Sequence, residues 1–110
     1  MPAFKVKSVS EYFETLEKRF EPAGAKGVDA IFQFELGDDG TYHVEVKDGG
    51  MSVHEGAADK PTTVIKMTGD NFVQMSNGDL NGQMAYMTGK MKISGSIPMA
   101  MKMKAIFPQA

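Results

Sequence analysis

The feature that most constrains the fold is an alternation of apolar and polar residues in the first half of the chain. It occupies residues 32–36, 42–47 and 51–54, separated by the turn-forming stretches Gly37-Asp-Asp-Gly40 and Asp48-Gly-Gly50. A period of two residues sends neighbouring side chains to opposite faces of a strand. Three short strands joined by such turns predict an antiparallel meander with one apolar and one wet face.

A helical pattern precedes this meander. Apolar residues recur at three- and four-residue intervals within residues 9–21, and Ser8 with Glu11 makes a plausible capping box. Pro22 ends the pattern. The sequence therefore predicts one amphipathic helix over residues 9–21, with acidic side chains outside and aromatic side chains inside.

Four shorter elements are predicted after the meander. The β-branched segment 62–68 predicts a fourth strand, and Asp70 is a good N-cap for a short helix that Asn77-Gly78 ends. A second short helix closed by Gly89 follows. The alternation in residues 90–93 then predicts a fifth strand.

The last element, residues 96–107, fits two periods. Its methionines alternate with alanine and lysine as in a strand, but Met99, Met103 and Ile106 also share one face of a helix. Pro98 near a first turn favours the helix. The whole order predicts an α+β fold, a five-stranded and largely antiparallel sheet with its helices on one face.

Composition sets the class of protein. A chain of 110 residues suits one domain over residues 1–110, and 42% apolar with 24% charged residues is typical of a folded chain. A pI near 5.6 without a basic face argues against nucleic acid as a partner. The chain has no cysteine, no apolar run like a signal peptide or membrane span, and no terminal Ser-Lys-Leu, so we expect a cytoplasmic location.

Methionine is concentrated near the C-terminus, where residues 72–107 hold seven of the ten. Methionine is flexible and polarizable, so it adapts to changing partners better than leucine and specifies a unique packing less well. Two interpretations follow from this. The segment encloses a cavity or groove for a flexible apolar ligand, or it is an ordinary core with a methionine bias.

Charge is also uneven. Residues 1–79 hold eight basic and fourteen acidic side chains, whereas residues 80–110 hold four lysines and no acid. The four are Lys90, Lys92, Lys102 and Lys104. They could approach an anionic membrane or an anionic head group, or they could be solvated lysines on a strand and a helix.

No catalytic or metal-binding pattern is present. His43 and His54 fall on the wet face of predicted strands without a nearby nucleophile or ligand set. The Asp-Gly clusters at 38–40 and 48–50 lack the other oxygen ligands of a calcium loop and are interpreted as turns. We expect no catalytic residue, no metal site and no cofactor.

Several stretches resemble the sterol carrier protein type 2 family of lipid-binding domains. They are Ala30-Ile-Phe-Gln-Phe-Glu35, Thr63-Val-Ile-Lys-Met67, Gly89-Lys-Met-Lys-Ile-Ser-Gly95 and Ala100-Met-Lys102. The resemblance covers nearly the whole chain. It implies a sheet and helices around an apolar tunnel that accepts sterols, fatty acids, fatty acyl-CoA or phospholipids.

Carried over by position, the resemblance implies a lining for this tunnel on the last three helices. Its members are Phe72, Met75, Leu80, Gln83, Met84, Met87, Met99, Met103 and Ile106. Gln83 is the one polar member and would orient a head group. Gly82 stands where the family has proline, a departure that bears on the shape of the ligand.

The function expected first is non-enzymatic lipid binding and transfer. Under this hypothesis, Met84→Lys or Met103→Glu would abolish acyl-chain binding in a folded protein. The alternative is a protein-interaction or dimerisation module that uses the methionine-rich surface, so either a monomer or a homodimer is expected. An enzyme is the third reading, disfavoured because Tyr86 is the one titratable residue expected near the tunnel.

Overall fold

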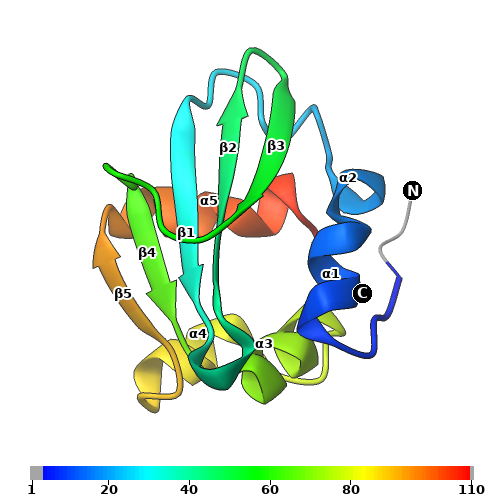
Figure 1. Cartoon of the computed structure of the whole chain (residues 1–110), viewed down its shortest axis with the longest axis vertical. Coiled ribbons are helices and arrows are strands. Elements are labelled where there is room, and N and C mark those ends of the chain that lie inside the picture. The colour runs from blue at the N-terminus through cyan, green and yellow to red at the C-terminus, as the bar shows by residue number, and fades with distance from the viewer. Residues whose placement is uncertain (1–3, 110) are drawn as a thin grey trace.

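The computed structural model describes residues 4–109, and residues 1–3 and 110 of the predicted domain lie outside the described residues. One five-stranded sheet, in the order β3-β2-β1-β4-β5, forms its centre (Figure 1). The strands are β1 Ala30–Glu35, β2 Thr41–Lys47, β3 Gly50–Glu55, β4 Thr63–Lys66 and β5 Lys92–Gly95. The predicted α+β fold is confirmed.

The predicted meander forms β1, β2 and β3, which pair antiparallel as expected. Phe32 and Phe34 of β1 and Val44 and Val46 of β2 point to the same face and are fully buried there. This face is the apolar side of the alternation. The helices cover it, with α5 passing behind the sheet in Figure 1.

The fourth strand departs from the expected antiparallel pattern, because β4 pairs with β1 in parallel and makes the sheet mixed. Two neighbouring parallel strands need a connection that returns along the sheet. Residues 56–62 make this return by crossing in front of the sheet (Figure 1). Gln33, predicted to be on the wet face, is 5% exposed beneath the crossing, where its Oε1 accepts a bond from the Ala58 amide at 2.8 Å.

The predicted helix over residues 9–21 is divided in two, α1 Val9–Glu14 and α2 Leu16–Arg19. The division falls at Thr15, whose hydroxyl donates to the Glu11 carbonyl at 2.6 Å and whose backbone leaves the helical region. A threonine hydroxyl that bonds to the preceding turn competes with the regular ladder. The expected cap is present, because the Ser8 hydroxyl accepts from the Glu11 amide at 3.1 Å.

Three helices follow the fourth strand, α3 Gly69–Ser76, α4 Gly82–Met87 and α5 Ile97–Ile106. The N-cap of α3 is Thr68 and not the predicted Asp70, because the Thr68 hydroxyl accepts from the amide three residues on. Gly78 and Gly89 take the left-handed conformation after α3 and α4, as expected. The ambiguous last element is a helix, capped by Ser96.

The C-terminal end of α5 approaches the chain after α2 closely. A Cβ on Gly24 would lie 2.1 Å from the Ala105 carbonyl oxygen, so only glycine fits there. The Glu21 amide donates to the Ile106 carbonyl at 2.8 Å beside it. These contacts fix one end of the last helix against the N-terminal half of the molecule.

Aromatic rings fill the core between α1, α3 and the sheet. Phe13 stacks on Tyr42 with ring centroids 4.1 Å apart, and Tyr12 meets Phe72 edge to face at 4.7 Å. Phe34 contacts both Phe13 and Phe72 at 5.5 Å. Such pairs add to the free energy gained by burying their area.

Candidate functional site

A cavity of about 310 Å³ lies between the sheet and helices α3, α4 and α5. Its volume is at the lower end of the range usual for small-molecule sites, roughly 300 to 1,000 Å³. The lining residues are Tyr12, Ile65, Phe72, Met75, Ser76, Asn81, Gly82, Gln83, Tyr86, Met91, Ile93, Ala100, Met101, Met103, Lys104, Phe107 and Gln109. Most of this wall is apolar, which suits an apolar ligand.

The lining of the cavity is apolar in its buried part and more polar at its exposed opening. Ile65, Phe72 and Met103 are buried and apolar. We call the exposed lining residues of α4 and α5 the mouth, and they are Gln83, Tyr86, Met101 and Lys104. An apolar interior with polar groups at its opening is the usual arrangement of a site for an amphipathic ligand.

Four of the nine residues expected to line the tunnel reach this cavity. Phe72 and Met75 come from α3, Gln83 from α4 and Met103 from α5. Phe72 and Met75 lie on the buried face of α3, whereas Gln83 stands at the mouth. Ligand contact by these four residues stays a prediction.

The other five do not line the cavity. Leu80 and Met99 are partly buried against the core, and Ile106 is fully buried in it. Met84 and Met87 are 54% and 71% exposed. Helix α4 begins after Leu80 and turns Ala85 toward the core, which leaves Met84 and Met87 outside the cavity lining. Ligand contact by these five residues also stays a prediction.

Tyr12 and Lys104 correct the expectation that Tyr86 would be the one titratable residue near the ligand. Both line the cavity together with Tyr86. Burial raises the pKa of the Tyr12 phenol above its ordinary value, and the nearby Arg19 charge opposes this shift. The phenol is therefore neutral at physiological pH. Tyr12 precedes Phe13 in the helical pattern, and only the tertiary arrangement reveals its place at the cavity.

Arg19 is a second residue that the sequence pattern does not reveal. It is 4% exposed and donates to the carbonyls of Phe4, Ser76 and Pro108 at 2.5 to 3.2 Å. Its guanidinium also lies over the Tyr12 ring, 5.0 Å from the centroid. Burial lowers the pKa of Arg19, and Tyr12 opposes this. This side chain joins both ends of the chain to α3.

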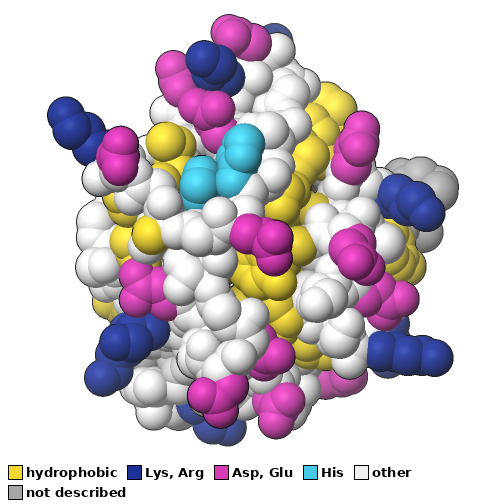
Figure 2. All heavy atoms as spheres, in the orientation of Figure 1, with side chains coloured by type: hydrophobic (Ala, Val, Ile, Leu, Met, Phe, Trp, Pro, Cys, Tyr) yellow, Lys and Arg dark blue, Asp and Glu magenta, His cyan; other side chains and the backbone are white. Residues whose placement is uncertain are grey.

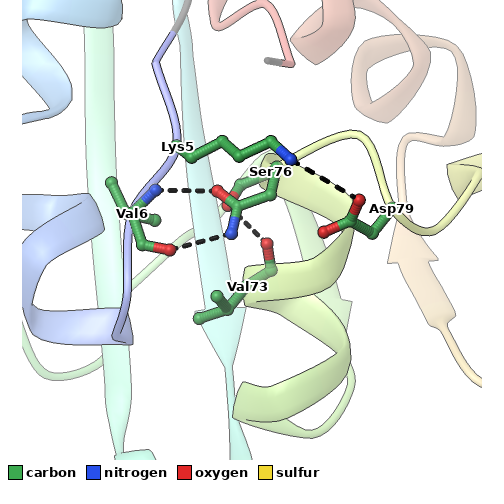
Figure 3. Close-up of polar contacts among 6 residues, drawn as sticks. Lys5, Val6, Val73, Ser76 and Asp79 are labelled. Carbon is green, nitrogen blue, oxygen red and sulfur yellow. Dashed lines mark hydrogen bonds and ion pairs between the residues drawn. The ribbon is translucent and has the colours of Figure 1, made fainter.

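A second junction lies beside it, between the N-terminal segment and the end of α3. The Asn77 side chain accepts from the Val6 amide and donates to the Val6 carbonyl, both at 2.8 Å. Lys5 and Asp79 form an ion pair at 3.9 Å on the exposed side, and Ser76 bonds back to Val73 (Figure 3). These bonds hold α3, and with it Phe72 and Met75, at the cavity.

The four lysines of the C-terminal third divide between two faces. Lys104 stands at the mouth, and Lys90 and Lys102 are exposed beside α4 and on α5. Lys92 lies opposite Lys66 in the β4–β5 register, next to the Ile65–Ile93 pair that faces the cavity. Neighbouring residues of a strand point to opposite faces, so Lys92 faces away from the cavity.

The two histidines form a stacked pair on the sheet face away from the helices. His43 and His54 are directly opposed in register, with ring centroids 4.8 Å apart, and the histidines lie side by side in Figure 2. The His43 Nδ1 lies 2.9 Å from the Gly56 carbonyl, so its ring holds the start of the crossing segment. Among residues 4–109, no group of three or more potential metal ligands is found.

The fold and the lined cavity define a class of small α+β domains that have an apolar cavity between the sheet and the helices. The SCP-2 sterol transfer family model matches residues 13–108, and this chain belongs to that family. Human hydroxysteroid dehydrogenase-like protein 2 is 35% identical over 105 residues, which cover 93% of this chain. Those residues make up 25% of the human protein, so the chain spans about a quarter of its length.

Solved structures give the same fold. The sterol carrier protein domain 2 of Helicoverpa armigera is 26% identical, with a TM-score of 0.73 over 88% of this chain and 83% of that one. Palmitated SCP2L2 from Aedes aegypti is 22% identical, with a TM-score of 0.71 over 90% and 93%. The similarity to the Aedes aegypti structure shows a shared fold and nothing further.

The helices of the described residues are short. Over residues 4–109, none combines the length and apolar character needed to cross a bilayer.

Proposed function

We propose that the chain is a lipid-binding and transfer domain that holds the acyl chain of a fatty acid, fatty acyl-CoA or phospholipid, or a sterol-like ligand, in the cavity behind the sheet. The observation that carries this proposal is the 310 Å³ apolar cavity between the sheet and α3, α4 and α5. Membership of the SCP-2 sterol transfer family supports it. The palmitate on the domain from Aedes aegypti favours an acyl chain as the first ligand to test.

Phe72, Met75 and Met103 would contact the apolar part of the ligand, and Gln83 would orient its head group at the mouth. Lys104 lines the same opening as Gln83 and suits an anionic head group. The flexible thioethers of Met75 and Met103 allow the cavity to adjust its shape to different chains.

The expected strength of binding suits exchange. Burying about ten methylenes gains roughly 8 kcal/mol. Ordering the ligand costs several kcal/mol, which leaves an affinity of about micromolar. A carrier at this affinity releases its ligand readily.

Native mass spectrometry tests the proposal. The purified protein is measured as isolated, after delipidation, and after incubation with fatty acids, acyl-CoAs, phospholipids and a sterol. We expect adducts of one lipid per chain that disappear on delipidation and return selectively. A protein that takes up nothing from this mixture would overturn the proposal.

The alternative of an interaction or dimerisation module is supported by exposed apolar residues such as Met87, which is 71% exposed. A mass that rises with concentration, without lipid uptake, would favour it. No feature of residues 4–109 assigns catalysis to this chain. A cytoplasmic location stays a prediction.

A further inference from the structure

The exposed apolar surface of the molecule is confined to two helices. Among residues 4–109, every exposed large hydrophobic side chain lies on α4 or α5. These residues are Met84, Tyr86, Met87, Ile97 and Met101, with exposures from 37% to 71%. Isolated apolar side chains on a surface need no explanation, but a set confined to the two helices that border one cavity marks an interaction site.

Four of these five residues lie at the opening of the cavity or beside it. Tyr86 and Met101 line it from opposite helices. Met87 is four residues after Gln83 on α4, and Ile97 is four residues before Met101 on α5. Residues four apart share a helix face, so Met87 and Ile97 extend the rim outward from the mouth.

Positive charge flanks the same rim. Lys90 follows α4, while Lys102 and Lys104 lie on α5, and residues 80–110 include no acidic side chain. The N-terminal helices differ, because Glu14 and Glu17 are exposed there. The molecule therefore presents a cationic apolar face at the cavity and acidic side chains on α1 and α2.

We infer that α4 and α5 dock on the surface of an anionic lipid bilayer, with the mouth of the cavity against the lipid. The docking face comprises the five exposed apolar residues together with Lys90, Lys102 and Lys104. The inference deepens the proposed lipid-carrier function and rests on it. Flexible apolar side chains between lysines suit a fluid anionic interface, where the thioethers enter the acyl boundary and the ammonium groups meet the head groups.

Vesicle binding tests the inference, with co-sedimentation on phosphatidylcholine vesicles that contain or lack about one third phosphatidylserine. We expect binding to the anionic vesicles that weakens with salt. Each exposed lysine near such a surface contributes about fivefold in affinity, so Lys90→Gln with Lys102→Gln should weaken binding roughly 25-fold at low salt. The matched control, Lys18→Gln with Lys26→Gln, removes two exposed lysines near the N-terminus and should change binding less than threefold.

The apolar part of the face has its own variant, Met84→Asp with Met87→Asp. Both residues lie outside the cavity lining, so lipid uptake in vesicle-free native mass spectrometry should persist while vesicle binding falls at least tenfold. If the unchanged protein takes up no lipid in native mass spectrometry, the proposed carrier function is refuted. Intact uptake with vesicle binding that both variant pairs leave unchanged would refute the docking face alone.

The orientation can be read directly, because the chain contains no cysteine. Single variants Met87→Cys and Lys18→Cys are labelled with an environment-sensitive fluorophore and mixed with the anionic vesicles. We expect the emission at position 87 to shift to the blue and that at position 18 to stay unchanged. A shift at position 18 alone, or self-association through the labelled face without lipid, would overturn the inference.

Discussion

The core on one side of the cavity and the helices on the other side differ in their side chains. On α1, α3 and the sheet, aromatic rings such as Phe13, Phe34 and Phe72 interlock, with exposures of 6% or less. On α4 and α5, methionines stand at the rim, and Met87 is 71% exposed. Interlocked rings define one arrangement, whereas flexible thioethers permit several. The fold therefore combines a fixed wall with an adaptable one.

The largest expected effect is a loss of unfolding free energy when a ring is removed from the aromatic side. Phe34→Ala removes a fully buried ring that contacts two others, and we expect it to lower the free energy of unfolding by about 3–5 kcal/mol. Met87→Ala, on the other side, should change it by about 0.5 kcal/mol or less. Urea unfolding followed by circular dichroism gives both values. Equal losses would remove the distinction between the two walls.

Arg19 joins the termini to the aromatic side, and its loss is expected to have the next largest effect. Arg19→Met leaves the carbonyls of Phe4, Ser76 and Pro108 without their donor, which should cost about 2–4 kcal/mol in unfolding free energy. Lys18→Met is the matched control on the same helix, exposed and expected to stay within about 0.5 kcal/mol. If Arg19→Met is as stable as Lys18→Met, Arg19 does not stabilise the junction between the termini and α3.

On α4 and α5, the position of a methionine decides how strongly its substitution changes fatty-acid affinity. Met103 is buried in the cavity wall, so Met103→Glu should weaken fatty-acid affinity at least tenfold, or about 1.4 kcal/mol. Met84→Glu places the same charge outside the cavity and should change affinity less than twofold. This differs from the expectation that Met84→Lys would abolish binding. Fluorescent fatty-acid displacement, with circular dichroism as a folding check, measures both variants.

The smallest expected effect is a loss of stability at alkaline pH. Burial raises the pKa of Tyr12 above its ordinary 10.0, so the unfolded chain loses this proton first and stability falls as pH rises. The loss should approach about 1.4 kcal/mol per pH unit above pH 10. Burial lowers the pKa of Arg19, which contributes with the opposite sign at higher pH.

Urea unfolding between about pH 9 and 11 measures this slope. Tyr12→Phe should flatten it relative to the unchanged protein, because the replaced ring has no proton to lose. Parallel profiles for the two proteins would show that the Tyr12 phenol has no part in the alkaline loss.

The order of elements could be predicted from local patterns because each signal is carried by nearby residues. The alternation around Phe32 and Phe34 and the Ser8 cap depend on the chain within a few positions, and the structure reproduces them. The parallel pairing of β4 with β1 could not be predicted in this way. It depends on how residues 56–62 return across the sheet, which no period in the sequence encodes.

The candidate site was predictable in its location and only partly in its members. Composition pointed to the methionine-rich helices, but helix rotation decides which methionine faces inward. Ala85 takes the inward position on α4 because a small residue allows that helix to approach the core, which leaves Met84 outside. Tyr12 and Phe107 reach the cavity from the two ends of the chain, which is a tertiary fact.

The mixed sheet also has a consequence for the time course of folding. β1 meets β2 across a short turn, whereas its other neighbour, β4, arrives only after β3 and the crossing segment 56–62. Contacts between residues far apart in the chain form later, because more of the chain must be ordered first. The meander should therefore be the early folding unit, and the cavity closes last, when β4, β5 and the final helix complete the opposite side of β1.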